Sequence, residues 1–135
     1  MTIYDQLRRD EGVRLKPYRC TAGKLTVGVG RNLDDVGITE TEAEYLLQGD
    51  VCKVLAELKT AGYEGDLTDP RFAALANMAF NLGTQGLLKF QATLAAYRAR
   101  DWPAMAERML ASLWARQVGP RAVRLAKQVT TGEWQ

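Results

Sequence analysis

Three side chains near the start of this 135-residue chain could do chemistry together: the carboxyl of Glu11, the thiol of Cys20 and the hydroxyl of Thr26. Nine and then six positions separate them. The chain has no histidine, which excludes imidazole bases and the Ser/His and Cys/His dyads. General acid chemistry therefore falls to a carboxyl group, and the spacing alone leaves the reaction open.

Capping and glycine signals predict a helix that carries the first of these residues. Thr2 with Asp5 predicts the start of a helix over residues 2–11, and Gly12 predicts its end. Glu11 is then the last helical residue, where the helix dipole disfavours a negative charge and favours the protonated acid. This placement makes Glu11 the best candidate for a proton donor.

A predicted hairpin carries the thiol and the hydroxyl. Its strands cover residues 15–20 and 25–29, with a short turn between them. Alternation places Thr26 on the face opposite the apolar side chains. Gly28 and Gly30 leave open backbone on that face, which suits a closely approaching ligand.

The rest of the chain is predicted to be helical. Thr39 with Glu42 forms a second capping box, and Asp69-Pro70 starts a helix with an apolar stripe. The predicted helices cover about 39–60, 70–82, 90–98, 101–112 and 120–127. The fold class is therefore α+β, mostly α, with one small hairpin among helices.

Composition indicates a globular protein of one domain or of two small lobes that share a helix. Its apolar fraction of 47% and charged fraction of 25% are ordinary, and no apolar run could span a membrane. The net charge is +2, with −3 on residues 1–83 and +5 on residues 84–135. The basic part favours an anionic partner or simply a solvated helical surface. We expect no metal and no cofactor, and two free thiols rather than a Cys20–Cys52 bridge.

Segments along the whole chain match one known family in order and spacing. They are DEGVRLK at 10–16, LTVGVG at 25–30, ITETEAE at 38–44, ALANMAFNLG at 74–83, and Trp102, Trp114, Arg121-Ala122 and TGEW at 131–134. These segments resemble the phage-type lysozymes, the endolysin muramidases of glycoside hydrolase family 24.

The resemblance implies a lysozyme-like two-lobe fold in one domain over residues 1–135. A β-hairpin lobe would cover about 12–38, and a linking helix about 39–60. The helical lobe would cover about 66–135 together with the N-terminal helix 2–11.

The resemblance also implies a reaction, which is hydrolysis of the β-1,4 bond between N-acetylmuramic acid and N-acetylglucosamine in bacterial peptidoglycan. Glu11 would be the general acid, and Thr26 with Cys20 would position the attacking water, with inversion at the anomeric carbon.

Seven further residues receive roles from the resemblance. Arg121 would pair with Glu11, and Asn77 would orient Arg121. Arg31 and Asp50 would form a structural ion pair. The substrate would contact Gly30, Phe80 and Thr93. Phe80 is equally well explained as a core residue.

Cys20 is a departure, because the family usually carries an aspartate at this position. Without that aspartate the chain lacks the second carboxylate that a retaining glycosidase needs, and Glu11 is the one obvious acid. Two alternatives follow. The chain could be a lytic transglycosylase, in which a hydroxyl of the sugar attacks, or a non-catalytic module that binds the cell wall or belongs to a phage tail.

The expected partner is bacterial peptidoglycan, with the protein acting as a monomer. Nucleic acid is not expected, because no recognition helix is apparent. The basic C-terminal region, with Arg116, Arg124 and Lys127, is a candidate for transient contact with an anionic envelope surface. No signal peptide is apparent, so we expect the protein in the host cytoplasm until a membrane pore releases it to the cell wall.

Overall fold

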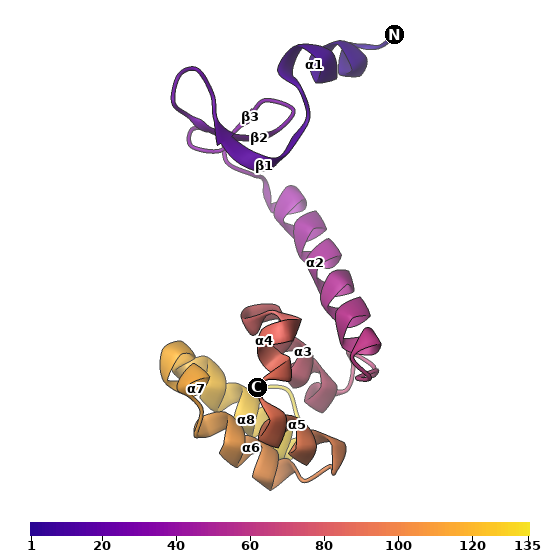
Figure 1. Ribbon diagram of the computed structural model, residues 1–135, viewed down its shortest axis with the longest axis vertical. Coiled ribbons are helices and arrows are strands. Elements are labelled where there is room, and N and C mark those ends of the chain that lie inside the picture. Colours follow the sequence, from indigo (N-terminus) through magenta and orange to yellow (C-terminus); the bar gives the residue numbers. More distant parts are fainter. The chain divides into compact units, whose positions relative to one another are not determined.

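A computed structural model describes all residues, 1–135, and the chain divides into two compact units, Met1–Leu47 and Gln48–Gln135. The first unit holds one short helix, three strands and the beginning of a long helix (Figure 1). The second holds the remainder of that helix and six shorter ones. The predicted α+β, mostly α fold class is confirmed. No helix has both the length and the apolar character needed to cross a bilayer.

Helix α1 covers Ile3–Glu11 and is bounded by the predicted signals. The Thr2 hydroxyl accepts from the Asp5 amide at 3.2 Å, and the Asp5 carboxylate accepts from the Thr2 amide at 2.8 Å. At the other end Gly12 has φ +78°, and its N–H donates to the Arg8 carbonyl. Glu11 is therefore the last residue of the helix, as the sequence predicted.

The sheet is antiparallel with strand order β1-β2-β3. Its strands are β1 (Arg14–Arg19), β2 (Leu25–Gly28) and β3 (Arg31–Asn32). The register pairs Tyr18 with Thr26 and Thr26 with Asn32. Thr26 thus lies on the central strand, while the two-residue strand β3 was too short to predict.

The turn between β1 and β2 is closed by backbone hydrogen bonds. The Gly23 amide donates to the Cys20 carbonyl at 2.8 Å, and the Cys20 amide donates to the Lys24 carbonyl at 2.9 Å. Gly23 has φ +77°, which a glycine adopts without strain. A tight turn followed by a left-handed residue is a common hairpin connection, and it fixes Cys20 at the turn's first position.

Helix α2 covers Glu40–Thr60 and includes the boundary between the two units. The predicted capping box is present at its start. The Glu42 amide donates to the Thr39 hydroxyl at 3.1 Å, and the Thr39 amide donates to the Glu42 carboxylate at 2.9 Å.

Six helices follow in the second unit. They are α3 (Pro70–Leu82), α4 (Thr84–Leu88), α5 (Gln91–Arg98), α6 (Trp102–Leu110), α7 (Leu113–Val118) and α8 (Pro120–Thr131). Predicted helices correspond to α3, α5, α6 and α8, although α8 continues four residues beyond the predicted end. Helices α4 and α7 were not predicted, because five or six residues span too few turns to display a helical period.

The hydrophobic core belongs to the second unit. Side chains from every one of its helices are buried, and α8 packs against α3, α6 and α7. The largest fully buried side chains are Phe72, Leu58, Leu75, Met78, Leu87, Met105, Met109 and Val129. Burying each such side chain contributes about 1.5–3 kcal/mol. The first unit differs, because Thr26 is its only buried residue.

The predicted lobe boundaries remain predictions. Residues 2–11 fall in the first compact unit, together with the sheet. Their predicted membership of the helical lobe is likewise still a prediction.

Candidate functional site

The carboxyl group of Glu11 lies directly against the backbone of Gly30. A Cβ atom built on Gly30 would stand only 2.8 Å from Glu11 Oε2 and 3.1 Å from its carboxyl carbon. Gly30 also has φ +65°, a conformation that L side chains rarely adopt. The end of α1 and the turn between β2 and β3 therefore meet at this point, and both the backbone conformation and the carboxyl group require glycine there.

Cys20 and Thr26 lie close together where the hairpin turn closes. The Thr26 hydroxyl donates to the Lys24 carbonyl at 2.9 Å and also lies within hydrogen-bonding reach of the Cys20 thiol. Both thiols of the chain are free. The structure thus brings together the two residues to which the sequence analysis gave the attacking water.

The turn also changes the acidity of the thiol. Hydrogen bonds from backbone N–H groups, first that of Lys24 and then that of Ala22, lower the pKa of Cys20 below its ordinary value. Desolvation opposes this shift, and the neighbouring Thr26 side chain adds to it. The turn therefore raises the fraction of thiolate at a given pH, and the thiolate is the form that can accept a proton.

Thr26 is more enclosed than its sequence pattern predicted. We expected an open face, but Thr26 is 3% exposed and its hydroxyl points back to the Lys24 carbonyl. Open space remains beside it at Gly28, where a built Cβ atom would meet nothing within 4 Å. The accessible chemical groups of the hairpin are therefore Glu11, which is exposed, and Cys20, which is half-buried.

Arg31 has a partner that the sequence analysis did not name. It donates from Nη1 and Nη2 to the two carboxylate oxygens of Glu42, at 2.7 and 2.8 Å. Nη1 also donates to the Gly37 carbonyl at 3.2 Å. Glu42 occupies the first turn of α2, within the first unit, whereas Asp50 belongs to the second unit. The pairing of Arg31 with Asp50 stays a prediction.

The sequence analysis did not identify Glu42 as the ion-pair partner of Arg31. Its hydrogen bonds with Arg31, together with that from the Thr39 amide, lower the pKa of Glu42 to about 2. One signal could have found it, because a capping-box carboxylate has a second oxygen free to bind a cation. The pair ties strand β3 to the start of α2.

In the second unit, Arg121 and Asn77 form the predicted contact. Arg121 donates from Nε and Nη2 to Oδ1 of Asn77, at 3.0 and 2.7 Å. This bonding fixes the plane of the guanidinium group. The pairing of Arg121 with Glu11 stays a prediction.

The other predicted site residues differ in exposure. Phe80, near the end of α3, is 43% exposed, so the core explanation does not account for it. Thr93 on α5 is 3% exposed and is buried among the helices. Asp50 is exposed on α2. No cluster of three or more Cys, Asp or Glu side chains could hold a metal ion.

A comparison with known families decides where the chain belongs. A family described as Phage lysozyme matches residues 8–129, which include both the hairpin site and the helical core. The chain belongs to the phage lysozyme family. The Glu11–Gly30 contact and the Cys20 turn are thus features of a phage lysozyme domain.

Relatives of this phage lysozyme domain occur in chains of different lengths. It is 31% identical over 161 residues to the pre-baseplate central spike protein Gp5 of Enterobacteria phage T4, covering 98% of this chain and 28% of that protein. It is 40% identical over 81 residues to an endolysin of Acyrthosiphon pisum secondary endosymbiont phage 1, covering 57% and 54%. It is 26% identical over 161 residues to probable T4-type lysozyme 1 of Dictyostelium discoideum, covering 97% and 95%. The matches thus span about a quarter of the first relative and half of the second.

Proposed function

We propose that this protein is a lysozyme that hydrolyses the β-1,4 bond between N-acetylmuramic acid and N-acetylglucosamine in bacterial peptidoglycan. The observation that carries the proposal is the carboxyl group of Glu11, held at the end of α1 against Gly30 in a phage lysozyme domain. Two of the relatives, an endolysin and a probable T4-type lysozyme, support it by their names.

Glu11 is the proton donor in this proposal. Hydrolysis passes through an oxocarbenium-like transition state and needs a proton on the leaving glycosidic oxygen. General acid catalysis requires the neutral, protonated form of this carboxyl group. Glu11 gives its proton to the glycosidic oxygen as the bond from that oxygen to the anomeric carbon breaks.

Cys20 holds the attacking water in this proposal, and the buried Thr26 side chain positions the Cys20 thiol beside that water. The oxygen of this water bonds to the anomeric carbon from the face opposite the leaving group, which inverts the configuration. Its proton passes to the Cys20 thiolate, which the turn's N–H groups stabilise. The thiolate therefore replaces the missing carboxylate as the base, without a covalent intermediate.

A lysis assay with three variants tests this assignment. On permeabilised Gram-negative cells, Glu11→Gln is expected to lower the rate of turbidity loss by roughly 10²–10⁴-fold, the usual contribution of a general acid. Asp10→Asn is the matched control, because Asp10 is the neighbouring acid on α1 and its carboxylate pairs with Arg9. Cys20→Ala should fall between them.

Two results of this assay would contradict the proposal. If Glu11→Gln lysed cells as fast as the wild type, Glu11 would not be the acid. If neither the wild type nor Glu11→Gln lysed cells while both bound the cell wall, the chain would be a non-catalytic wall-binding module.

A lytic transglycosylase is the second candidate. The observation that favours it is the thiol at position 20, which leaves Glu11 without a carboxylate partner on the turn. Mass spectrometry of digested peptidoglycan separates the two reactions. Products that carry one added water support the hydrolase, and anhydro-muramic ends support the transglycosylase.

We also propose that the basic C-terminal region contacts anionic envelope surfaces through its exposed positive charges. The apolar side chains of Leu125 and Val129 on α8 are buried in the core, whereas Arg116, Arg124 and Lys127 are exposed. Reversing the charges of Arg116 and Lys127 should weaken envelope affinity and reduce its salt dependence. Unchanged affinity would contradict this contact.

A further inference from the structure

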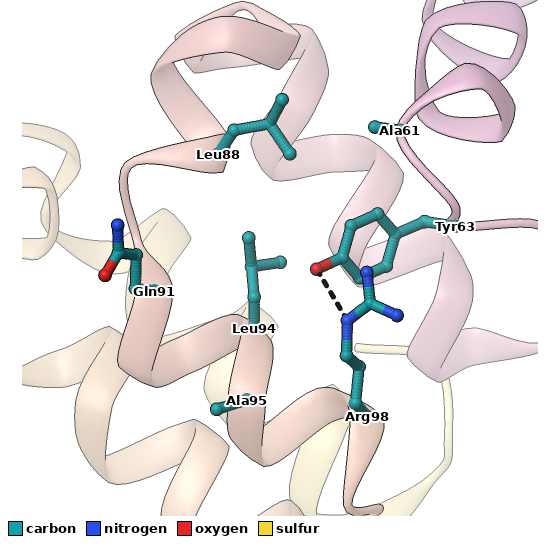
Figure 2. Close-up of a pocket in the computed structure, with 7 residues that line it drawn as sticks. All are labelled: Ala61, Tyr63, Leu88, Gln91, Leu94, Ala95 and Arg98. Carbon is teal, nitrogen blue, oxygen red and sulfur yellow. Dashed lines mark hydrogen bonds between the residues drawn. The ribbon is translucent and has the colours of Figure 1, made fainter.

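The second unit has a pocket whose residues took no part in the assignment above. It has a volume of about 390 Å³ and lies between the end of α2 and helices α4 and α5. In Figure 2 the side chains of Leu88, Leu94 and Tyr63 border a common space, and Arg98 lies beside the Tyr63 ring. Gln91, from the first turn of α5, adds an amide to the lining.

Arg98 is held in place by Tyr63. Its Nε donates to the Tyr63 hydroxyl at 3.1 Å, and its guanidinium carbon lies 4.3 Å from the centre of the Tyr63 ring. Tyr63 is only 7% exposed, so the ring cannot move freely. On another side, a Cβ atom built on Gly62 would stand 3.6 Å from Nη2. The guanidinium group is thus oriented before any ligand arrives.

The charge of Arg98 is not neutralised by the protein. None of the chain's ion pairs involves Arg98, and no acidic side chain lines the pocket. Its Nε is used by Tyr63, which leaves the N–H donors of Nη1 and Nη2. Such a fork matches a carboxylate in geometry and charge.

We propose that this pocket binds the C-terminal carboxylate of the short peptides that peptidoglycan carries. Such a peptide ends in D-alanine, which combines a carboxylate with a small methyl group. The carboxylate would bind the Nη donors of Arg98, the methyl group would pack on Leu88 and Leu94, and the Gln91 amide would bond to the peptide group. This inference rests on the proposed action on peptidoglycan and adds a contact to its peptide part.

The lining favours this ligand over a more highly charged anion. The pocket holds a single cation, and its other walls are apolar or carry uncharged polar groups. A phosphate with two charges would leave one of them unpaired beside leucine side chains, which is unfavourable. One charge with a small apolar body fits the pocket better.

The test is a titration of the full chain with diacetyl-Lys-D-Ala-D-Ala, followed by amide chemical shifts in NMR spectra. In the wild type, shifts are expected at residues 61–63 and 88–98. Arg98→Ala should weaken binding roughly tenfold or more, as expected when a charged hydrogen-bonded partner is removed. Arg98→Lys keeps the charge but loses the fork, so its affinity should lie between the two.

Three controls keep the result specific. Arg108→Ala removes an exposed positive charge from α6, outside the pocket, and should change the affinity less than twofold. Ala95→Phe fills the pocket from its exposed lining residue while keeping Arg98, and should also weaken binding. The same peptide with a C-terminal carboxamide should not bind.

The inference is overturned if the probe shifts none of these amides, or if Arg98→Ala or the carboxamide peptide binds as well as the reference. The lysis assay is independent of this titration. Normal lysis without probe binding would remove only the peptide site. Probe binding without lysis would leave the site standing and remove the proposed hydrolysis.

Discussion

The two units of this phage lysozyme domain are stabilised in different ways. The helical unit buries apolar side chains from every one of its helices, whereas the hairpin unit buries only Thr26. Several apolar residues of the hairpin unit instead line an open groove of about 570 Å³ beside β2 and the start of α2. Hydrophobic burial therefore explains the helical unit but not the hairpin unit.

Hydrogen bonds and special backbone conformations hold the hairpin unit together. Capping boxes begin α1 and α2, the turn at Cys20 is closed by backbone hydrogen bonds, and Arg31 binds Glu42 through two. All the groups proposed for the reaction lie in this unit. The comparison indicates that local hydrogen bonds position the proposed reactive groups, while the packed helices supply most of the stability.

The largest expected effect is a loss of stability when a core side chain of the helical unit is truncated. Phe72 is 2% exposed, and Phe72→Ala should destabilise the protein by about 3–5 kcal/mol through lost burial and a cavity. Urea unfolding measures this change. Val27→Ala in the half-buried strand β2 is the matched change, and it should cost less than about 2 kcal/mol. Equal losses would contradict the contrast between the units.

The next effect concerns activity, at Gly30. A Cβ atom there would collide with the Glu11 carboxyl, so Gly30→Ala must displace the proposed acid. We expect at least a tenfold loss of lysis, since catalysis depends on geometry at the scale of 1 Å. Gly37→Ala is the matched control, because Gly37 has nearly the same φ, +66°, but its Cβ atom would meet only the Leu33 carbonyl at 3.9 Å.

Both glycine variants carry the strain of a positive φ, which costs on the order of 1 kcal/mol. Their stabilities should therefore fall by similar amounts. If the two variants also lost activity equally, backbone strain would explain the loss, and the contact between Gly30 and Glu11 would have no special role.

Sequence predicted well the features that depend on nearby residues. The capping boxes at Thr2 and Thr39 and the end of α1 at Gly12 are interactions over three or four positions, and each is present. The core of α3 follows from its apolar period. The short helices α4 and α7 left no such period to detect.

Features that depend on chain geometry could not be predicted. Glu11 and Gly30 were both singled out, but their contact depends on how the chain turns between α1 and β1. The pairing of Arg31 with Glu42 was not predicted either, because it depends on how β3 meets the start of α2, where one carboxylate serves both Thr39 and Arg31.

A smaller effect tests the ion pair that ties β3 to α2. Arg31 lowers the pKa of Glu42 to about 2, below its ordinary value of 4.5. The lowered pKa in the folded state means that the pair stabilises fully above pH 4.5, and that this contribution is lost as the pH falls towards 2. An NMR titration of the Glu42 carboxyl should give a midpoint near 2.

Variants in the first turn of α2 test the same pH dependence of the Arg31–Glu42 ion pair. Glu42→Gln should reduce the protection of hairpin amides from hydrogen exchange at pH 7, and this difference should shrink between pH 5 and 2. Glu40→Gln removes an acid from the same turn that forms no ion pair, and should change little. A Glu42 midpoint at or above 4.5 would show that the pair is not formed.

The smallest effect sharpens the comparison by asking whether the hairpin acts independently. Because backbone N–H groups of Lys24 and Ala22 lower the pKa of the Cys20 thiol, a larger fraction of it is thiolate at a given pH. In a Cys52→Ser background, the rate of alkylation by iodoacetamide should reach half its plateau below pH 8.5, the ordinary midpoint of a free cysteine. In urea the midpoint should return to that value.

The same alkylation measurement on the Phe72→Ala variant tests whether the hairpin depends on the helical core. Its helical core is weakened, but every group that lowers the pKa of Cys20 lies within residues 20–26 of the hairpin. The alkylation midpoint should therefore be the same in Phe72→Ala as in the reference protein under conditions where both remain folded. A midpoint that rose in Phe72→Ala would mean that the helical core holds the turn in shape, and that the two units do not divide stability and chemistry between them.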